Sequence, residues 1–539
     1  MNFIVPQWEP DAQAMPNDNF VHLAQLARNT ELSLTLLLLN EAPGLRYQLN
    51  FNGLVGMPWW SVFDAIQDIP LREGLPFDPA DIPIPENSDL IYDFAQVLIV
   101  QDDRLLGRIY QHPNVGVWDV WWQTDNGGHR VDQYDDRGFV STRTWLDADK
   151  QVIKKEWLDV TGEWVLRQTD RVIVAPQALD RFKHSDYPDI RSVVGEYLAN
   201  YLGESKDENT LIGLANDESV AMSPFIPQNV TSHYFVTNTQ DTAIDKLAPH
   251  TDSFITQTTI LTRKVKARLK DVSGSNRVQV RTIPPFSTHL QLGHSNEVAE
   301  VITYWHVNGL DKAVADTIFN HFLEQFERDD DIRLIVDADN DEQTDHFQQA
   351  ALIFAAKKAG IDLDSHMFAR IQSAVSGSEL PPEEPDATSP EVTTAVEMAA
   401  VAGDAKETVA AEEKELIGRV QAFLARIEYQ VQADYEQVTQ SFATARQLVD
   451  IGSNPDLFMQ IAAISAGIPQ INLVETGYVK NGENGIIIEQ LADFAKAADY
   501  YLNSLAPWNE ALVANAHLID QYSEQHTQSL WQEVLVDGR

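Results

Sequence analysis

The chain has 539 residues, more than one domain normally holds, so two or three domains are expected. Its net charge of −42 repels phosphate backbones and anionic lipid, which argues against nucleic acid and direct membrane insertion, although a generally acidic proteome would give the same charge. Cysteine is absent, which excludes disulfides, thiolate catalysis and cysteine-ligated metals.

The N-terminal residues do not resemble a targeting segment. Residues 1–11 carry no positively charged stretch and no long apolar run. The most apolar stretch of the chain, Leu32–Leu39, is far too short to cross a bilayer. We therefore expect a cytoplasmic protein that is peripheral at a membrane only through partners.

The first 39 residues predict the opening of a doubly wound parallel sheet. Residues 3–6 begin as a strand, and 17–29 place apolar residues at helical spacing, with Asn17 or Asn19 as the N-cap. Residues 32–39 form the continuous apolar run of a strand that is buried on both faces. This β-α-β order is typical of α/β folds.

Residues 93–164 predict an antiparallel meander, because short segments alternate in hydrophobicity between turn residues such as Asp102-Asp103. Half of the 12 tryptophans fall in this region: Trp118, Trp121, Trp122, Trp145, Trp157 and Trp164. These rings can pack across strands in a thin sheet, or they can form a face that binds peptide or sugar. The candidates for protein binding are Trp118, Trp121, Trp122 and Trp145.

The α/β pattern returns after Arg171 and continues in a second unit. In the first unit a helix is expected over 190–202 and strands over 210–215, 233–237, 253–257 and 278–283. The basic run 263–270 is expected to be a solvated helix face or strand end. In the second unit strands are expected over 298–305 and 332–338 and helices over 311–326, 341–359, 493–505 and 509–536.

Two polar features interrupt the second unit. Asp337, Asp339 and Asp341 follow a strand, where they could bind a metal or could serve as a helix cap and turn. Residues 377–415 hold eleven acidic residues against two lysines. This composition predicts a mobile insertion that is dispensable for folding, either simply solvated or acting as an acidic arm for a basic partner.

Residues 461–488 are the most informative segment. They contain a run of small residues that ends at Gly467, then Ile-Pro-Gln-Ile, and later Asn484-Gly485. This pattern resembles the nucleotide-sugar half of a GT-B glycosyltransferase.

In retaining enzymes of that type glutamates occupy two positions where this chain has Asn454 and Ala462. Their loss removes charge-assisted contacts worth about 1.5–3 kcal/mol each. We interpret Gly482, Asn484 and Gly485 as turn residues of a degenerate donor pocket, and we expect no cofactor.

Four segments together resemble one family: 3–8, 45–67, the hairpin 134–142, and 461–488. The family is the first of the Asp (accessory secretory) proteins of the accessory Sec system of Gram-positive bacteria. The resemblance implies an α/β, GT-B-like body with two Rossmann-like domains and an inserted antiparallel β-sheet domain. The expected division is 1–45 with 171–298 for the first Rossmann-like domain, 46–170 for the insertion, 299–506 for the second Rossmann-like domain, and 507–539 packing back on the first.

The resemblance also implies partners. These are sibling Asp proteins, the accessory SecA ATPase and a serine-rich repeat glycoprotein adhesin. The leading hypothesis is a non-catalytic component of the export machinery. The alternatives are an active cytosolic glycosyltransferase that modifies the adhesin, and an assembly protein unrelated to secretion. No HExxH pair, GxxxxGK loop or GxSxG elbow supports other chemistry, and no metal site is expected.

Overall fold

A computed structural model describes the chain except for residues 11–14, 16–17, 71, 113–114, 205–207, 240–241, 377–412 and 537–539. The chain forms two compact units. Unit 1 contains Met1–Pro285 and Thr527–Arg539, and unit 2 contains Phe286–His526. Most of the acidic insertion expected at 377–415 lies outside the described residues, and 413–415 begin a helical stretch over 413–424.

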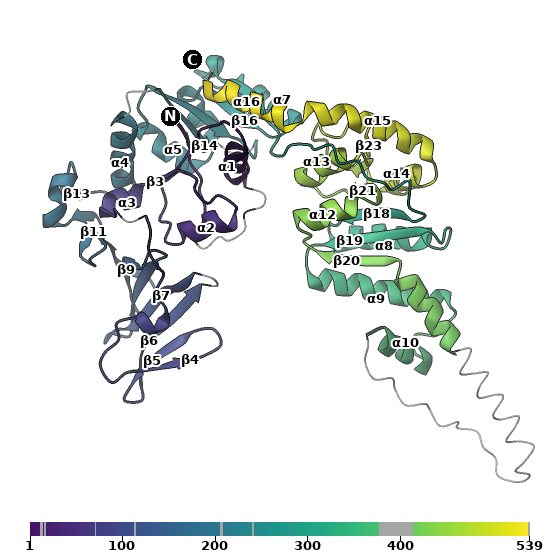
Figure 1. The fold of residues 1–539 in the computed structure, drawn as a ribbon, viewed down its shortest axis with the longest axis horizontal. Helices are drawn as coiled ribbons and strands as arrows, with labels where there is room; N and C mark the ends of the chain where they lie inside the picture. Colours follow the sequence, from purple (N-terminus) through teal and green to yellow (C-terminus); the bar gives the residue numbers. More distant parts are fainter. Residues whose placement is uncertain are drawn as a thin grey trace, which may run out of the picture. The chain divides into compact units, whose positions relative to one another are not determined.

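Unit 1 is built on a parallel sheet (Figure 1). Its strand order is β17-β16-β15-β14-β1-β2-β3. The strands are β1 Asn2–Ile4, β2 Thr35–Leu38, β3 Trp59–Ser61, β14 Asn209–Leu214, β15 Val230–Phe235, β16 Ser253–Thr256 and β17 Gln279–Thr282. Both faces of this sheet are covered by apolar side chains, because Phe3 and Leu37 enter one core while Ile4 and Leu36 enter the other. This two-sided burial explains the continuous apolar run of β2.

The helices of unit 1 are α1 Asn19–Asn29, α2 Leu45–Phe51, α3 Val62–Gln67, α4 Ile190–Glu204, α5 Asp217–Met222, α6 Ala243–Leu247, α7 Thr259–Leu269 and α16 Glu524–Val536. Short 3-10 turns lie at Pro79–Asp81, Pro176–Arg181, Ser223–Phe225, Ala248–His250 and Ser275–Arg277. The cap of α1 is Asp18, and the expectation of Asn17 or Asn19 was wrong. The Asp18 carboxylate accepts the N–H groups of Phe20 and Val21, both at 2.9 Å.

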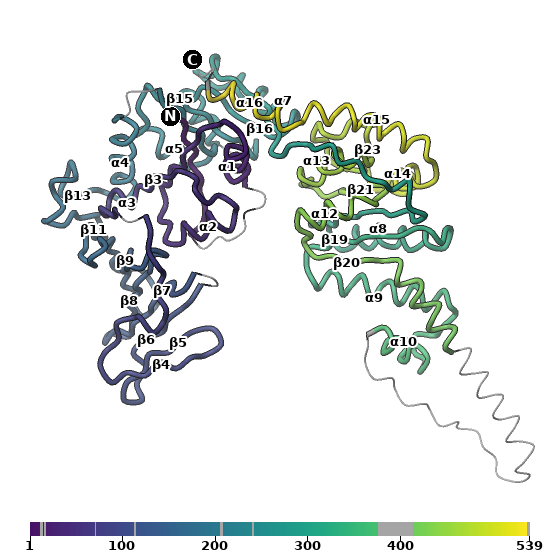
Figure 2. Tube along the Cα trace, in the orientation of Figure 1, coloured from purple at the N-terminus to yellow at the C-terminus, as the bar shows by residue number. Residues whose placement is uncertain are grey.

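An antiparallel sheet of ten strands is inserted into unit 1, and its strands pair in sequence order from β4 to β13, as Figure 2 traces. They are β4 Asp89–Tyr92, β5 Val97–Gln101, β6 Arg104–His112, β7 Gly116–Gln123, β8 His129–Asp135, β9 Phe139–Leu146, β10 Val152–Leu158, β11 Trp164–Gln168, β12 Val172–Val174 and β13 Asp186–Tyr187. The sheet therefore begins later and ends later than the expected insertion at 46–170. Trp59 pairs in parallel with Leu36, which places β3 in the Rossmann-like sheet instead.

Buried and half-buried ion pairs join the inserted sheet to α3 and to the loop after β2. Arg137, in the turn between β8 and β9, donates to Asp64 of α3 at 2.8 and 2.9 Å and to Asp135 at 2.7 and 2.8 Å. Glu41 accepts Lys155 Nζ at 2.7 Å and Trp157 Nε1 at 2.9 Å. The hairpin motif at 134–142 thus has a structural use, because it anchors the insertion to α3.

Unit 2 is built on a second parallel sheet with the strand order β20-β19-β18-β21-β22-β23. The strands are β18 Val301–His306, β19 Ile332–Ala338, β20 Ile427–Val431, β21 Ala445–Asp450, β22 Gln470–Asn472 and β23 Gly485–Ile487. The helices are α8 Lys312–Gln325, α9 Asp341–Lys358, α10 His366–Ser376, α12 Tyr435–Phe442, α13 Leu457–Ala466, α14 Phe494–Leu502 and α15 Leu505–Gln521, with a 3-10 turn at Leu491–Asp493. The fold class expected from the sequence, two parallel α/β units with an inserted antiparallel sheet, is confirmed.

The C-terminal segment differs from the expected single helix. The helix breaks at Tyr522-Ser523, so α15 stays in unit 2 and most of α16 belongs to unit 1. Asn515 of α15 donates to the carbonyl of Ile468 at 3.0 Å, which holds α15 beside the end of α13. Trp531 of α16 contacts Phe235 with ring centroids 5.6 Å apart. Only the last part of the expected segment 507–539 therefore packs on unit 1.

Candidate functional site

The second parallel sheet has its topological switch point at β18, because β19 and β21 lie on opposite sides of it. Ligands of doubly wound sheets bind at the carboxyl ends of the strands at such a point. Here Asn308 Nδ2 donates to Asp450 Oδ1 at 2.8 Å and to the carbonyl of Asn454 at 2.9 Å. The other Asp450 oxygen accepts the N–H of Asp456 at 3.0 Å. A Cβ on Gly452 would lie 2.7 Å from the Asn308 amide, so Gly452 and Asn308 are in close contact at this end of the sheet.

A pair formed by the half-buried His306 and the buried Asp337 lies beside this crevice. Asp337 accepts His306 Nδ1 at 2.9 Å, Tyr304 Oη at 3.0 Å and the N–H of Ala433 at 3.0 Å. Burial by itself lowers the pKa of His306, but the hydrogen bond to Asp337 and the charge of Asp450 outweigh it and raise that pKa to about 9. Burial raises the pKa of the Asp450 carboxyl. This arrangement is an internal ion pair whose members are already bonded to one another.

The N-terminus of α13 meets the same crevice. Asp456 caps the helix by accepting the N–H groups of Phe458 at 2.7 Å and Met459 at 3.1 Å. A helix N-terminus would ordinarily favour an anion such as a phosphate. Here a carboxylate already uses these N–H groups, and Asp450 accepts the N–H of Asp456 behind it. The diphosphate of a nucleotide sugar at this helix would therefore lie beside two carboxyl groups, those of Asp450 and Asp456.

The two positions that would carry glutamates in an enzyme have different surroundings. Asn454 is exposed at the rim of the crevice, where its backbone carbonyl accepts from Asn308. Ala462 is half-buried on α13 and packs against the core that contains Met459 and Phe442. An alanine side chain offers no hydrogen-bond acceptor, so Ala462 cannot orient a sugar or a ribose.

The turn near the end of the 461–488 segment has structural contacts. Asn484 is fully buried, and its amide donates to the carbonyl of Tyr478 at 3.1 Å and to Asn515 Oδ1 at 3.0 Å. A Cβ on Gly485 would lie 2.4 Å from the carbonyl of Gln470, so β23 can approach β22 only with glycine there. Gly482 has a φ of 81° and open space around it, which suits a turn.

The carboxyl end of the first parallel sheet is closed in a similar way. Its switch point is β1, which lies between β14 and β2. Gln7, after β1, and Asn216, after β14, exchange side-chain hydrogen bonds across this point. The hollow that remains beside them, lined by Val5, Leu39 and Asn40 among others, has a volume of about 20 Å3. It holds at most a water molecule.

The four candidate tryptophans do not form one surface. Trp122 and Trp145 lie on one face of the antiparallel sheet, where cross-strand pairing gives the row Trp122–Arg130–Trp145–Lys154. We call these four residues the aromatic–cationic row. Lys154 Nζ lies 3.1 Å from the centroid of the Trp145 ring, and Trp122 Nε1 donates to Asp132 at 3.0 Å. Both rings are half-buried, so their contacts leave part of each ring accessible.

The other two tryptophans have different neighbours. Trp121 precedes Trp122 in β7 and therefore lies on the opposite face, 5.4 Å from His129 and 6.2 Å from Tyr110 between ring centroids. Trp118 sits where the pairing of β6 with β7 shifts register, and its ring lies 3.0 Å from where a Cβ on Gly44 would be. Trp118 therefore packs the insertion against the start of α2.

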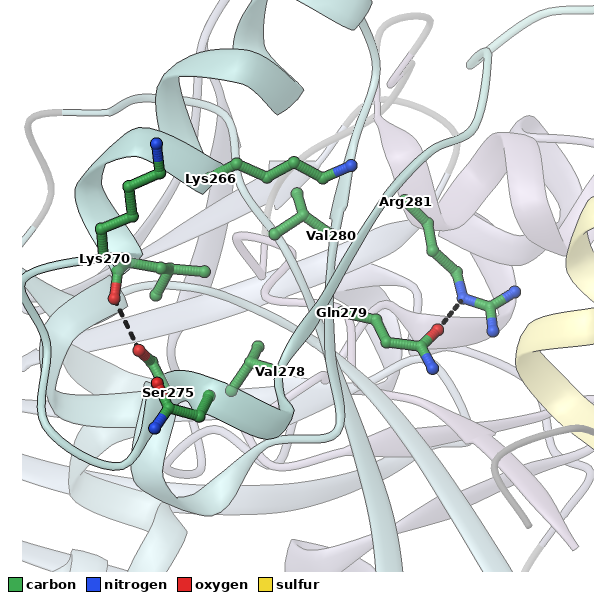
Figure 3. A pocket seen from close by; sticks show the side chains of 9 residues that line it. Lys266, Lys270, Ser275, Val278, Gln279, Val280 and Arg281 are labelled. Carbon is green, nitrogen blue, oxygen red and sulfur yellow. Dashed lines mark hydrogen bonds between the residues drawn. The ribbon is translucent and has the colours of Figure 1, made fainter.

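The basic run at 263–270 lies mostly on α7, beside the edge strand β17. Lys266 and Lys270 of this run and Arg281 of β17 line an open hollow of about 620 Å3 (Figure 3). Arg281 is engaged by Gln279 and Glu533, whereas Lys266 and Lys270 make no ion pair with any described residue. The run is thus largely the solvated helix face that the sequence predicts, with one cationic hollow.

The aspartates considered for a metal have other roles. Asp337 is paired as described above, Asp339 accepts the N–H of Gly309 at 2.9 Å, and the cap of α9 is Asn340. Within the described part of the chain, no group of three or more histidine or acidic side chains is placed to hold a metal ion. Of the helices that the structure describes, none combines the length and the apolar character that crossing a bilayer requires.

Sequence reasoning missed the residues that close both crevices. Gln7, Asn216, Asn308 and Asp450 each lie at or just beyond the carboxyl end of a parallel strand. A polar residue in this position is the signal that could have drawn attention to them.

Comparisons with known proteins identify the family and the fold. The family model for the first Asp protein of the accessory Sec system matches residues 3–356 and 393–537. The chain belongs to this family. It is 24% identical over 556 residues to the accessory Sec system protein of the same family in Streptococcus gordonii, and the match covers 99% of this chain and 96% of the relative.

Solved structures give the fold of this accessory Sec family member. A crystal structure of accessory secretory protein 1, 2 and 3 in Streptococcus pneumoniae matches with a TM-score of 0.69 and 22% identity, over 100% of this chain and 99% of that chain. The pneumococcal O-GlcNAc transferase GtfA in complex with UDP and GlcNAc matches with a TM-score of 0.63 and 12% identity, over 100% and 98%. The GT-B-like fold is therefore confirmed.

Proposed function

We propose that this accessory Sec family member is a non-catalytic component of the export machinery. In this proposal it works in the cytoplasm, reaches the membrane only through partners, and binds sibling Asp proteins, the accessory SecA ATPase and a serine-rich repeat glycoprotein adhesin. The observation that carries the non-catalytic part is the bridge at the switch point, where Asn308 donates to Asp450 and to the backbone carbonyl of Asn454. The complex of accessory secretory proteins 1, 2 and 3 described for the pneumococcal relative supports the sibling partners.

An active glycosyltransferase is the second candidate, and the fold favours it. The pneumococcal O-GlcNAc transferase GtfA, which has a similar fold, is in complex with UDP and GlcNAc in its crystal structure. Against this candidate stand the alanine at position 462 and the two carboxyl groups, Asp450 and Asp456, at the start of α13. Isothermal titration calorimetry with UDP-GlcNAc and UDP-glucose decides between them. We expect any binding to be weaker than a dissociation constant of about 1 mM, which is the weak end of the affinity scale. Micromolar binding with donor turnover would establish the enzyme.

The aromatic–cationic row is the proposed contact surface for the adhesin or a sibling Asp protein. Trp145 and Trp122 supply partly accessible rings beside two cations, Arg130 and Lys154, which are ion-paired with the buried Asp132 and Glu156. Tryptophan and arginine are enriched at protein interfaces. Trp121 lies on the other face, so it offers a matched control with the same side chain in the same sheet.

The experiment compares Trp145→Ala with Trp121→Ala in the full chain. Purified sibling Asp proteins and a purified glycosylated serine-rich repeat fragment are captured by each variant, and folding is checked by circular dichroism. We expect Trp145→Ala to weaken capture about tenfold or more, as for a typical interface anchor, and Trp121→Ala to leave it unchanged. Equal capture by both folded variants would remove the row as the contact surface.

A further inference from the structure

The strand β4 is the free edge of the ten-stranded antiparallel sheet (Figure 1). It pairs with β5 through the register Asp89↔Val100 to Tyr92↔Val97, and the N–H of Asp93 donates to the carbonyl of Gln96 at 2.9 Å. Hydrogen-bonded and non-hydrogen-bonded pairs alternate along an antiparallel ladder. The N–H and C=O groups of Leu90 and Tyr92 therefore point away from β5, toward the open edge.

Large apolar side chains stand exposed along this edge and its turn. The exposed fractions are 49% for Ile91, 63% for Tyr92 and 105% for Phe94. Leu90, in contrast, is half-buried and packs against the core that contains Ile82. Natural proteins usually blunt an edge strand with charges, proline or a cover, because unpaired backbone groups beside apolar side chains invite pairing with another chain.

The chain segment that contains β4 is acidic. Residues 73–103 contain eight acidic residues and no lysine or arginine, and Asp89 and Asp93 flank the strand. The nearest cations along the chain are Arg104, which is largely exposed and lies 4.0 Å from Asp125, and Arg108, which donates to the neutral Gln96 at 3.0 Å. A strand that docks on this edge gains from lysine and arginine side chains, and an acidic strand is repelled.

We propose that the outer edge of β4 receives an extended, basic segment of a partner protein, which adds to the sheet as a further antiparallel or parallel strand. The N–H and C=O groups of Leu90 and Tyr92 bond the incoming backbone, and Ile91, Tyr92 and Phe94 contact its apolar side chains. A second copy of this chain is a poor occupant, because two such acidic edges would face each other. This site is separate from the aromatic–cationic row and does not depend on the proposed function.

The probe is a synthetic octapeptide of alternating lysine and valine, used with the full-length protein. Three peptides are compared by fluorescence anisotropy: this one, the same length with glutamate in place of lysine, and the lysine peptide N-methylated at alternate residues. We expect only the unmodified lysine peptide to bind, with an affinity that falls as salt is raised. Amide hydrogen exchange at Leu90 and Tyr92 should slow in its presence, while the amide of Ile91 changes little.

Two variants of Tyr92 separate backbone pairing from ring contact. Tyr92→Pro removes an N–H that faces the edge and leaves the bonds to β5 in place, whereas Tyr92→Ala keeps that N–H and removes the ring. We expect a loss of about tenfold in affinity for Tyr92→Pro, the size of one or two lost hydrogen bonds, and a smaller loss for Tyr92→Ala. If Tyr92→Pro does not fold, Asp89→Asn with Asp93→Asn must weaken binding of the lysine peptide instead.

Several results would overturn the proposal. One is equal binding of the lysine, glutamate and N-methylated peptides, and another is no binding of any of them. Dimerisation in sedimentation velocity that Tyr92→Pro abolishes would assign the edge to a second copy of the chain. Binding to phosphatidylcholine vesicles that Phe94→Ala abolishes, without peptide binding, would assign the exposed rings to a lipid surface.

Discussion

Asn308 and Asp450 join the loop after β18 to the end of β21 at the switch point of the second sheet, with Asn308 Nδ2 donating to Asp450 Oδ1 at 2.8 Å. Asp450 is fully buried and cannot bond to bulk water, so its carboxyl group depends on donors such as the Asn308 amide for hydrogen bonds. Gln7 and Asn216 make the equivalent bridge in the first sheet. The protein thus uses the two places where a doubly wound sheet normally receives a ligand to hold its own loops together.

The bridge should be measurable as stability. Asn308→Gly removes the amide while keeping a residue that suits the φ of 52°, and it should lower the free energy of unfolding by about 1–3 kcal/mol, the cost of leaving a buried acceptor unpaired. Asn308→Ala should lose about 1 kcal/mol more, because alanine is strained at this φ. Urea unfolding measures both. A wild-type stability for Asn308→Gly would mean that the crevice is wet rather than closed by this bond.

The pKa of His306 predicts how stability depends on pH. The folded-state value of about 9 exceeds the ordinary 6.5, so the contribution of His306 is fully present below pH 6.5 and is lost as pH rises through 9. The contribution is on the order of 3 kcal/mol for a shift of this size. We expect the free energy of unfolding to fall between pH 7 and pH 10.

The variant His306→Gln isolates this effect, because glutamine can still donate to Asp337 but cannot take a proton. Urea unfolding of both proteins at several pH values should give a smaller fall between pH 7 and pH 10 for His306→Gln. The two curves would run parallel if other groups cause the change, and an NMR titration of the imidazole provides the direct reading of its pKa.

Gly485 and Gly482 test whether the turn in the 461–488 segment is structural. In Gly485→Ala the new Cβ would lie 2.4 Å from the carbonyl of Gln470, and both atoms are fixed to the backbone and cannot move freely. We expect a loss of several kcal/mol, at or beyond the usual range of about 1–3 kcal/mol for overpacking, or a failure to fold. Gly482→Ala meets only open space and should cost about 1 kcal/mol through its positive φ. Thermal unfolding that ranks the two variants in the opposite order would contradict this reading.

The sequence predicted the elements better than the long-range contacts. The apolar run at 32–39 predicts a strand buried on both faces because that pattern is local, and period-two alternation predicts the meander for the same reason. The helical pattern of 509–536 continues through Tyr522-Ser523, so the sequence does not indicate the break between α15 and α16. The bridge from Asn308 to Asp450 spans 142 residues, and pairing over such a distance cannot be read from periodicity. The tryptophans were identified, but the assignment of Trp121 to the opposite face depends on strand register.

The anchor of the inserted sheet gives the last prediction. Arg137 is buried, and although burial lowers its pKa, the hydrogen bonds to Asp135 and Asp64 raise that pKa above its ordinary value. Arg137→Ala leaves two carboxylates in low-dielectric surroundings and should lower the free energy of unfolding by about 3–5 kcal/mol. The matched control is Arg104→Ala, whose side chain is 73% exposed and lies 4.0 Å from an exposed Asp125; its melting temperature should stay at the wild-type value. Because the stranded carboxylates of Arg137→Ala can be neutralised by protons, its deficit should shrink when unfolding is measured at pH 5 instead of pH 7. A deficit that is the same at both pH values would assign the loss to the packing of the arginine side chain and not to its charge.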